Sequence, residues 1–283
     1  MAEGKLKIAT CQFAVSAVIK KNAQQIASFL RKARKANADI VHFPECALSG
    51  YASVDFRNFD GFDWKLLSSE TEKIMALAEQ LKLWVILGST HRLNPPNKPH
   101  NCLYLIGPDG KLVDRYDKRF CTVTDLKNYT PGNRFVNFTV NGVKCSLLIC
   151  FDLRFPELYR KLRTQNIDCI FQSFYNARQK GPSIHTHIMR QTAQARAATN
   201  YFRISMANAS GRYSPYPSCF IQPNGKIAKQ LTPNRAGLMI NSVDLKKSFY
   251  DPAEPFRDLA INGKLNNAAD TIKDPRSINT KSL

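Results

Sequence analysis

Three short segments of the chain each carry a reactive side chain directly after a predicted strand. Glu45 stands in HFPEC, Lys118 in RYDKR and Cys150 in LLICFDLRFPEL. A cysteine can act as a nucleophile, a glutamate as a general base, and a protonated lysine as a cationic hydrogen-bond donor. Taken singly, the three also fit a surface acid, a solvated charge and a core thiol. Their combination is what suggests catalysis.

The position of Cys150 makes it the most reactive of the eight cysteines on sequence grounds. It lies between a predicted buried strand and a tight connection to a helix, and Lys118 is another of the three candidate residues. A helix N-terminus and a nearby cation both lower the pKa of a thiol. We therefore expect a populated thiolate at Cys150.

Helical and strand periods alternate along the chain, which is typical of a layered α/β domain with a mixed sheet. A helix is expected to begin near the capping box formed by Ser69 and Glu72. No Gly/Ser linker divides the chain, so one domain is expected. The predicted strands cover 5–13, 39–43, 83–90, 101–107, 111–116, 144–150, 168–174, 201–207, 217–222, 226–231 and 237–243, and the other predicted helices cover 22–37, 156–165 and 186–200.

The formal net charge of +19 over 283 residues is the unusual bulk property. Such a charge suits a nucleic-acid binder, a membrane-surface protein or an enzyme of anionic substrates. The basic residues are spread along the chain, and no nucleic-acid motif or row of stacking aromatics accompanies them. The local cluster at 31–35 is expected to be the solvated face of a helix. We expect neither a nucleic-acid partner nor a membrane partner.

The cysteine pattern and the N-terminus favour a cytoplasmic protein. None of the cysteines forms a CxxC pair, and the first residues lack the apolar segment of a secretory signal. No apolar run approaches the roughly 20 residues that cross a bilayer. His185 and His187 form an HxH pair without further suitably spaced ligands, so no metal is expected.

The motifs occur in an order that resembles the nitrilase (carbon-nitrogen hydrolase) superfamily over nearly the whole chain. They are KIATCQF, PECALSGY, YDK, TPGN, LLICFDLRFPEL, ARAATN, ANASG, QPNGK and AGLMINSVDL. The resemblance implies an α/β fold, the four-layer αββα sandwich. It also implies a hydrolase domain over 1–260, followed by a polar tail over 261–283. A homodimer or higher homo-oligomer is expected on the same ground.

The resemblance further implies a thiol-dependent amidase with Glu45, Lys118 and Cys150 as its catalytic triad and no cofactor. Cys150 would attack an amide carbonyl and form a thioester, with Glu45 moving the proton. Lys118 and the backbone N–H of Phe151 would stabilise the oxyanion. Asp125 stands where the family usually has a second glutamate, six residues before the proline of TPG. Its side chain is one methylene shorter, so either the loop approaches more closely or this acid matters less.

Arg154, four residues after the cysteine, is the main candidate for substrate selection, since a guanidinium binds a carboxylate through two parallel hydrogen bonds. Pairing with Glu157 or with a loop carbonyl is the alternative. Tyr175 and Asn176 follow a strand end and are expected to line the same pocket. CFDLRFPEL resembles the ω-amidase and deaminated-glutathione amidase branch, which implies carboxylate-bearing ω-amides as substrates. N-carbamoyl amino acid or carbamoylputrescine hydrolysis, nitrile hydrolysis, and a non-catalytic basic binding protein on the same fold remain alternatives.

Overall fold

The computed structural model describes residues 3–177, 181–270 and 272–281, and it divides into two compact units, Met1–Tyr250 and Asp251–Leu283. Among the described residues, the first unit contains two six-stranded sheets and four α-helices. The second contains α5 (Glu254–Ile261) and α6 (Pro275–Ile278). Among the helices of the described residues, none has the length and apolar composition that crossing a membrane requires.

Each sheet has three parallel strands at its centre and antiparallel strands at its edges. The first sheet runs in the order β12 (Gly237–Asp244), β1 (Lys5–Gln12), β2 (Ile40–His42), β3 (Trp84–His91), β4 (His100–Ile106) and β5 (Leu112–Asp117). The second runs in the order β11 (Ile227–Gln230), β10 (Cys219–Ile221), β9 (Arg203–Asn208), β8 (Cys169–Phe174), β7 (Val143–Ile149) and β6 (Asn137–Val140).

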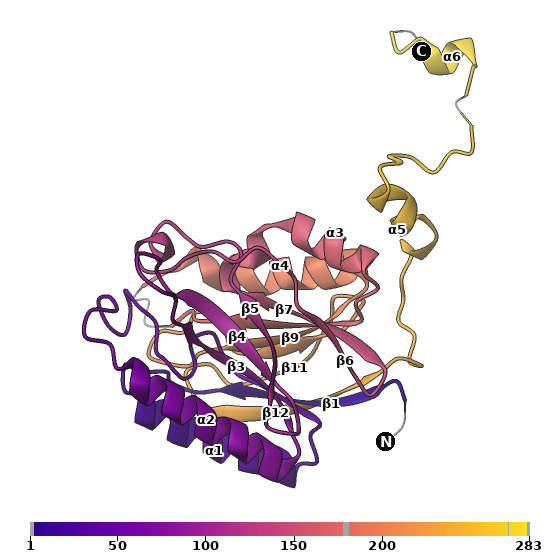
Figure 1. The fold of residues 1–283 in the computed structure, drawn as a ribbon. Coiled ribbons are helices and arrows are strands. Elements are labelled where there is room, and N and C mark those ends of the chain that lie inside the picture. Colours follow the sequence, from indigo (N-terminus) through magenta and orange to yellow (C-terminus); the bar gives the residue numbers. More distant parts are fainter. Residues whose placement is uncertain (1–2, 178–180, 271, 282–283) are drawn as a thin grey trace. The chain divides into compact units, whose positions relative to one another are not determined.

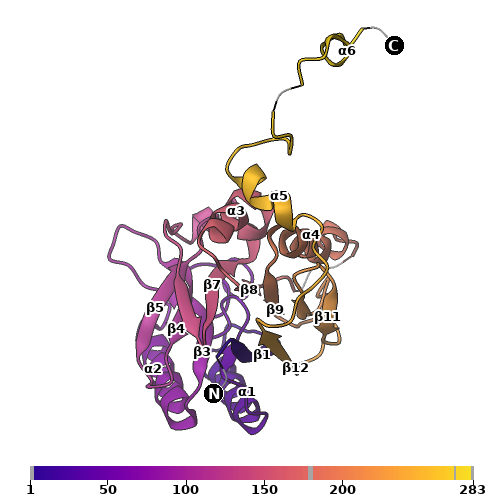
Figure 2. The ribbon, with the colours of Figure 1, turned by 90° about the vertical axis from the view of Figure 1, so that its right-hand side faces the viewer.

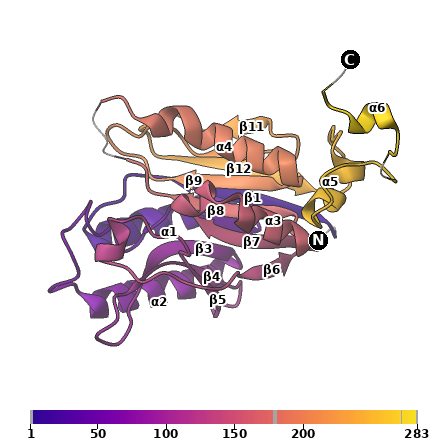
Figure 3. The ribbon, with the colours of Figure 1, turned by 90° about the horizontal axis from the view of Figure 1, so that it is seen from above.

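Two helices cover the outer face of each sheet, which confirms the predicted αββα sandwich. The pair α1 (Ile19–Lys35) and α2 (Trp64–Leu81) lies on one side, and α3 (Pro156–Thr164) and α4 (Ile184–Asn200) lie on the other (Figure 1). Figure 2, which is turned by 90° from Figure 1, also shows the two pairs on opposite sides of the sheets. Seen from above in Figure 3, α3 and α4 lie over the second sheet.

Side-chain alternation along the strands builds the layers. In β1, Leu6 and Ile8 belong to the hydrophobic core formed by residues of both sheets. Ala9 and Cys11 belong to the core that the first sheet forms with α1 and α2. Because successive side chains of a strand point to opposite faces, a strand buried on both faces serves two cores at once. Strand β3 therefore carries the continuous apolar run at 84–87, whose residues alternate between the two cores.

A buried histidine joins the two sheets below the loops that follow them. His42 in β2 makes hydrogen bonds of 2.9 Å through Nδ1 with Ser205 Oγ and through Nε2 with Ser173 Oγ. Burial lowers the pKa of His42 to about 3, so the ring is neutral. Ser173 also donates to the carbonyl of Phe43 at 2.8 Å, which fixes the chain just before Glu45.

The predicted start of the second helix is wrong. α2 begins at Trp64 rather than near Ser69, and the Asp63 side chain caps it by accepting from Leu66 N at 2.8 Å. Its first turn packs in an aromatic cluster with Phe59 and Phe62. Tertiary packing therefore extends the helix by one and a half turns, beyond the local capping signal. Strand β6 and helix α5 were not predicted at all.

Candidate active site

The predicted catalytic residues lie at one edge of the sandwich, where several strands end. Glu45 follows β2, Lys118 follows β5, and Cys150 follows β7. Strand β4 is the antiparallel neighbour of β5 and contains Asn101. The backbone N–H of Lys118 donates to the Asn101 carbonyl at 2.9 Å. Ligand sites of α/β folds commonly lie at the carboxyl ends of parallel strands.

Glu45 is fully buried, and its two carboxylate oxygens have different surroundings. Oε1 accepts hydrogen bonds from Lys118 Nζ at 2.8 Å and from Asn101 Nδ2 at 2.7 Å. Oε2 is buried and has no hydrogen-bond partner among the described residues. A buried carboxylate oxygen without a donor is costly. This oxygen is therefore the one available to take up a proton.

Lys118 lies between two carboxylates, with only 1% of its side chain exposed. Its Nζ donates to Asp125 Oδ2 at 2.9 Å as well as to Glu45. Asp125 in turn accepts from Tyr51 OH at 2.5 Å and from Thr122 N at 2.9 Å. The loop therefore approaches closely enough for the shorter aspartate to reach the lysine, which answers the question that the sequence left open.

The three charges tune one another. Burial raises the pKa of Glu45, the ammonium of Lys118 opposes that effect, and Asp125 adds to it. Burial also disfavours the Lys118 ammonium, but the carboxylates outweigh it and raise the pKa of this lysine. For Asp125, burial is overcome by Lys118 and Tyr51, which lower its pKa. The site thus holds a firmly protonated lysine beside a carboxylate that readily accepts a proton.

Cys150 sits in a strained turn. Its φ of 40° is in the left-handed region, which is unfavourable for a residue with a Cβ. The turn is the 3-10 helix Cys150–Arg154, between β7 and α3. Burial and the Glu45 carboxylate raise the pKa of Cys150 well above that of a free thiol, despite the nearby Lys118. The expected resting thiolate is therefore wrong, because burial and Glu45 outweigh the lysine, and the thiol needs a base to react.

A cavity of about 230 Å³ opens at Cys150. Asn176 follows β8, and its Nδ2 lies 3.6 Å from Cys150 Sγ. Asn176 is held by Tyr216, whose hydroxyl donates to Asn176 Oδ1 at 2.7 Å, and by Asn208. The backbone N–H of Tyr175 also bonds to the Cys150 sulfur. The other predicted pocket residues, Phe151 and Arg154, line the same cavity.

Arg154 is exposed at the cavity and has no carboxylate partner among the residues that the structure describes. Among the same described residues, Arg154 forms no ion pair with Glu157, which was the alternative. His185 lines the cavity too, whereas His187 does not. Within the described ranges, no group of three or more His, Cys, Asp or Glu residues is arranged to hold a metal ion.

Two residues of the site were not identified from the sequence. Tyr51 bonds Asp125, lies 3.4 Å from Lys118 Nζ and lines the cavity. Its only sequence signal was its place at the end of PECALSGY. Asn101 bonds Glu45, and nothing in its local sequence marks it, because its position follows from the pairing of β4 with β3, in which Asn101 lies opposite Thr90.

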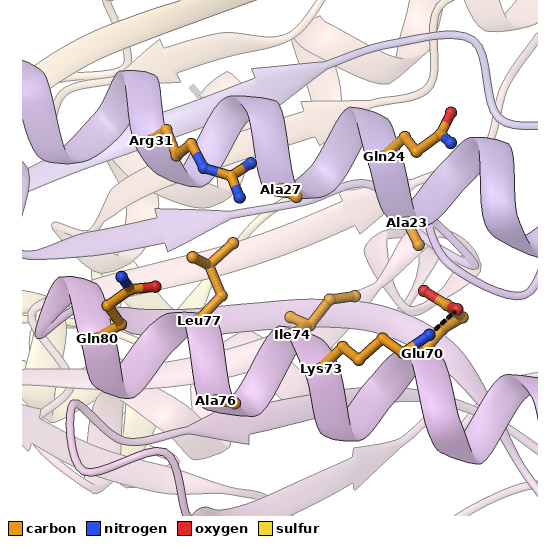
Figure 4. Close-up of a pocket in the computed structure, with 10 residues that line it drawn as sticks. All are labelled: Ala23, Gln24, Ala27, Arg31, Glu70, Lys73, Ile74, Ala76, Leu77 and Gln80. Atoms are coloured by element: carbon orange, nitrogen blue, oxygen red, sulfur yellow. Dashed lines mark hydrogen bonds and ion pairs between the residues drawn. The ribbon is translucent and has the colours of Figure 1, made fainter.

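A larger hollow, of about 410 Å³, lies between α1 and α2 on the far side of the first sheet (Figure 4). Its floor is formed by small and aliphatic side chains, including Ala23, Ala27 and Ile74. The one lysine drawn there, Lys73, is paired with Glu70 at 2.7 Å. Its lining includes no cysteine or histidine, so size alone does not mark it as a reaction site.

The comparisons with known proteins agree with this geometry. Residues 7–248 match the family model described as carbon-nitrogen hydrolase. The chain is 28% identical over 246 residues to the omega-amidase NIT3 of Saccharomyces cerevisiae, covering 80% of this chain and 83% of that protein.

Solved structures share the fold. An amidase from Nesterenkonia sp. AN1, solved with the acetamide moiety of fluoroacetamide added covalently at its active-site cysteine, matches with a TM-score of 0.74 and 19% identity, over 86% of this chain and 91% of that chain. A glutamine-dependent NAD+ synthetase from Acinetobacter baumannii matches with a TM-score of 0.71 and 20% identity. The match covers 87% of this chain but only 48% of the synthetase chain.

Proposed function

The chain belongs to the carbon-nitrogen hydrolase family, and from that premise we propose that Cys150, Glu45 and Lys118 are the catalytic triad of its amidase reaction. It is a thiol-dependent hydrolase of carbon-nitrogen bonds other than peptide bonds. The observation that carries the triad is the buried Oε2 of Glu45, which has no hydrogen-bond partner among the described residues, together with a thiol whose pKa burial and Glu45 raise. Such a thiol reacts only when a base removes its proton during the attack.

In the acylation half-reaction, Sγ of Cys150 attacks the amide carbonyl carbon while Glu45 accepts the thiol proton. The carbonyl oxygen gains negative charge, which the ammonium of Lys118 and the backbone N–H of Phe151 stabilise as hydrogen-bond donors. When the tetrahedral intermediate collapses, Glu45 gives its proton to the leaving nitrogen. Ammonia departs, and the acyl group remains on the sulfur as a thioester.

In the deacylation half-reaction, Glu45 takes a proton from water as the oxygen attacks the thioester carbonyl. Collapse of the second intermediate breaks the carbon-sulfur bond and returns the proton to the thiolate. Lys118 stays protonated throughout, because two carboxylates hold it at 2.8 and 2.9 Å. Asp125 is thus a supporting residue that keeps the ammonium charged and in position. The scheme uses only side-chain and backbone groups of this chain and water.

The favoured substrates are small amides that carry a carboxylate at the far end, such as the ω-amides of dicarboxylic acids. Arg154 supports this class, since its guanidinium lines the cavity without a carboxylate partner among the described residues. The relative in yeast is named an omega-amidase, which points the same way. Tyr175 and Asn176 would border the acyl group near the sulfur. N-carbamoyl amino acids carry the same carboxylate and are the second substrate class to test.

We also propose that the enzyme works as a homo-oligomer in the cytosol. All eight cysteines are free, and six of them are buried, which suits a reducing compartment. Light scattering of the purified protein gives its mass in solution, and a monomer would refute the oligomer. The predicted division into a hydrolase domain over 1–260 and a tail over 261–283 stays a prediction.

The test is ammonia release from a substrate panel by the wild type and by Cys150→Ala. The panel contains ω-amides of dicarboxylic acids, N-carbamoyl amino acids, carbamoylputrescine, simple amides and nitriles. We expect turnover of carboxylate-bearing amides that is lost in Cys150→Ala, with Cys121→Ala as the matched thiol control that retains it. Turnover that survives Cys150→Ala would refute the mechanism. Absence of turnover on every substrate, combined with salt-sensitive binding to nucleic acid, would instead favour a basic binding protein.

A further inference from the structure

Asp152 is a fully buried carboxylate, two residues after the nucleophile, that the proposed reaction does not use. It accepts three hydrogen bonds. Its Oδ2 accepts from Ile149 N at 2.9 Å and from Tyr116 OH at 2.7 Å, and its Oδ1 accepts from Phe120 N at 2.9 Å. No cation lies within ion-pair distance of it among the described residues.

The three donors come from the two segments that carry the reactive groups. Ile149 is the residue immediately before Cys150. Tyr116 and Phe120 stand two residues before and two residues after Lys118. One carboxylate therefore links the turn of the nucleophile, in the second sheet, to the loop of the lysine, which follows the first sheet.

Both segments need such a link. Cys150 has a left-handed φ of 40°, a conformation that persists only when the surrounding structure holds it. Lys118 must aim one ammonium at Glu45, at Asp125 and at the oxygen of the substrate. A small shift of one segment against the other would separate the nucleophile from its oxyanion donor, and misplacement by about 1 Å can cost about 100-fold in rate.

Resting on the proposed function, we propose that Asp152 is a positioning residue that holds the Cys150 turn in register with the Lys118 loop. It acts through its three hydrogen bonds and does not touch the substrate. Its burial has a cost, since desolvation raises the pKa of Asp152 to about 6 although the three hydrogen bonds oppose this rise. An apolar side chain of similar volume would leave the N–H groups of Ile149 and Phe120 without their acceptor, so this position requires an acceptor that reaches both segments.

Asp152→Asn is the informative variant because it keeps the size and removes one acceptor. An amide has a single oxygen, so its NH2 group must face either Phe120 N–H or Ile149 N–H, and that bond is lost. Tyr116→Phe is the milder variant, which removes one donor and leaves both backbone bonds. Tyr159→Phe is the matched control: Tyr159 is equally buried, and its hydroxyl bonds Gln172 at 2.6 Å rather than Asp152.

For each variant, kinetics with one amide give kcat and KM, and a thermal scan gives the melting temperature. The rate at which iodoacetamide alkylates Cys150 is followed separately by peptide mass. We expect Asp152→Asn to lower kcat by about 10- to 100-fold with KM nearly unchanged, as for loss of a charge-assisted hydrogen bond. Tyr116→Phe should lower kcat by about 3- to 10-fold. Alkylation should slow in the same order, and Tyr159→Phe should match the wild type in all but melting temperature.

The result that overturns the proposal is a folded Asp152→Asn with kcat and alkylation rate within about twofold of the wild type. If Asp152→Asn does not fold, Tyr116→Phe decides, and values within about twofold of Tyr159→Phe overturn it. The proposed function fails separately, when the wild type releases no ammonia from any substrate. The alkylation rates still test the positioning role in that case, because they need no substrate.

Discussion

Lys118 Nζ lies 2.8 Å from Oε1 of Glu45, and the other oxygen of that carboxylate is buried without a hydrogen-bond partner among the described residues. The ion pair therefore orients Glu45 while leaving one oxygen unoccupied. A carboxylate that was only structural would be expected to have both oxygens satisfied. In the proposed mechanism this asymmetry divides the work between the two residues: the lysine supplies charge, and Oε2 of Glu45 moves the proton.

Replacing Glu45 by Gln should lower kcat by about 100- to 10,000-fold, the usual contribution of a general base. The same change should lower the pKa of Cys150, because the Glu45 carboxylate is one of the groups that raise it. Ammonia release gives kcat, and alkylation rates measured across pH locate the midpoint of thiol ionisation. An activity loss with an unchanged or higher midpoint would contradict this assignment of the charge that acts on the thiol.

Replacing Asp125 by Asn should move the acid limb of kcat/KM to lower pH. Asp125 contributes to the raised pKa of Glu45, so removing its charge lowers the pH at which Glu45 becomes the active carboxylate. Asp125→Glu keeps the charge but adds a methylene against Tyr51, which already lies 2.5 Å away. It should keep the acid limb and lose about 1 to 3 kcal/mol of stability through overpacking. An acid limb that stays in place in Asp125→Asn would mean that the charge of Asp125 does not act on the pKa of Glu45.

Removing the guanidinium of Arg154 should affect only substrates that carry a carboxylate. Arg154→Met is expected to lower their kcat/KM by about 10- to 100-fold, the loss of a charged hydrogen-bond pair. Simple neutral amides should be unaffected. Lys161→Met, which removes an exposed cation of α3 outside the cavity, controls for the general positive field. Equal losses for both substrate classes would mean that Arg154 shapes the pocket rather than selects the substrate.

The sequence was sufficient to predict the layers of the fold, and it failed where contacts between distant strands decide. Apolar runs such as β7 predict strands because both faces are buried. Glu45 and Cys150 follow such runs, whereas Lys118 follows β5, an edge strand whose residues are mostly exposed or half-buried. Asn101 was missed because its approach to Glu45 depends on the register of β4 with β3, which itself pairs with β2. The start of α2 was misplaced because aromatic packing before Ser69 extends the helix.

The thiol of Cys150 shows the same limit in its electrostatics. Proximity to a lysine and to a helix start predicts a thiolate. Complete burial and the Glu45 charge reverse that prediction, because both penalise the anion. Neither burial nor the distance to a charge can be obtained from one segment of sequence.

His42 should make the stability of the protein fall as the pH drops from about 6.5 towards 3. Its pKa is about 3 in the folded state and about 6.5 in an unfolded chain, so between these values the unfolded chain binds a proton that the folded chain does not. The contribution is fully present above pH 6.5 and shrinks by up to about 5 kcal/mol at pH 3. Melting temperatures measured from pH 7.5 to pH 4 follow this loss.

His42→Gln isolates the contribution of the histidine, since carboxylates such as Asp125 also lose stabilisation in acid. The variant should melt lower than the wild type at pH 7.5, because Gln meets Ser173 and Ser205 less well than the ring does. Its melting temperature should then decline less steeply with acid, so that the two curves converge. Parallel curves over the whole range would mean that His42 has the same pKa in the folded protein as in the unfolded chain, and the assignment of a neutral bridge at acid pH would be wrong.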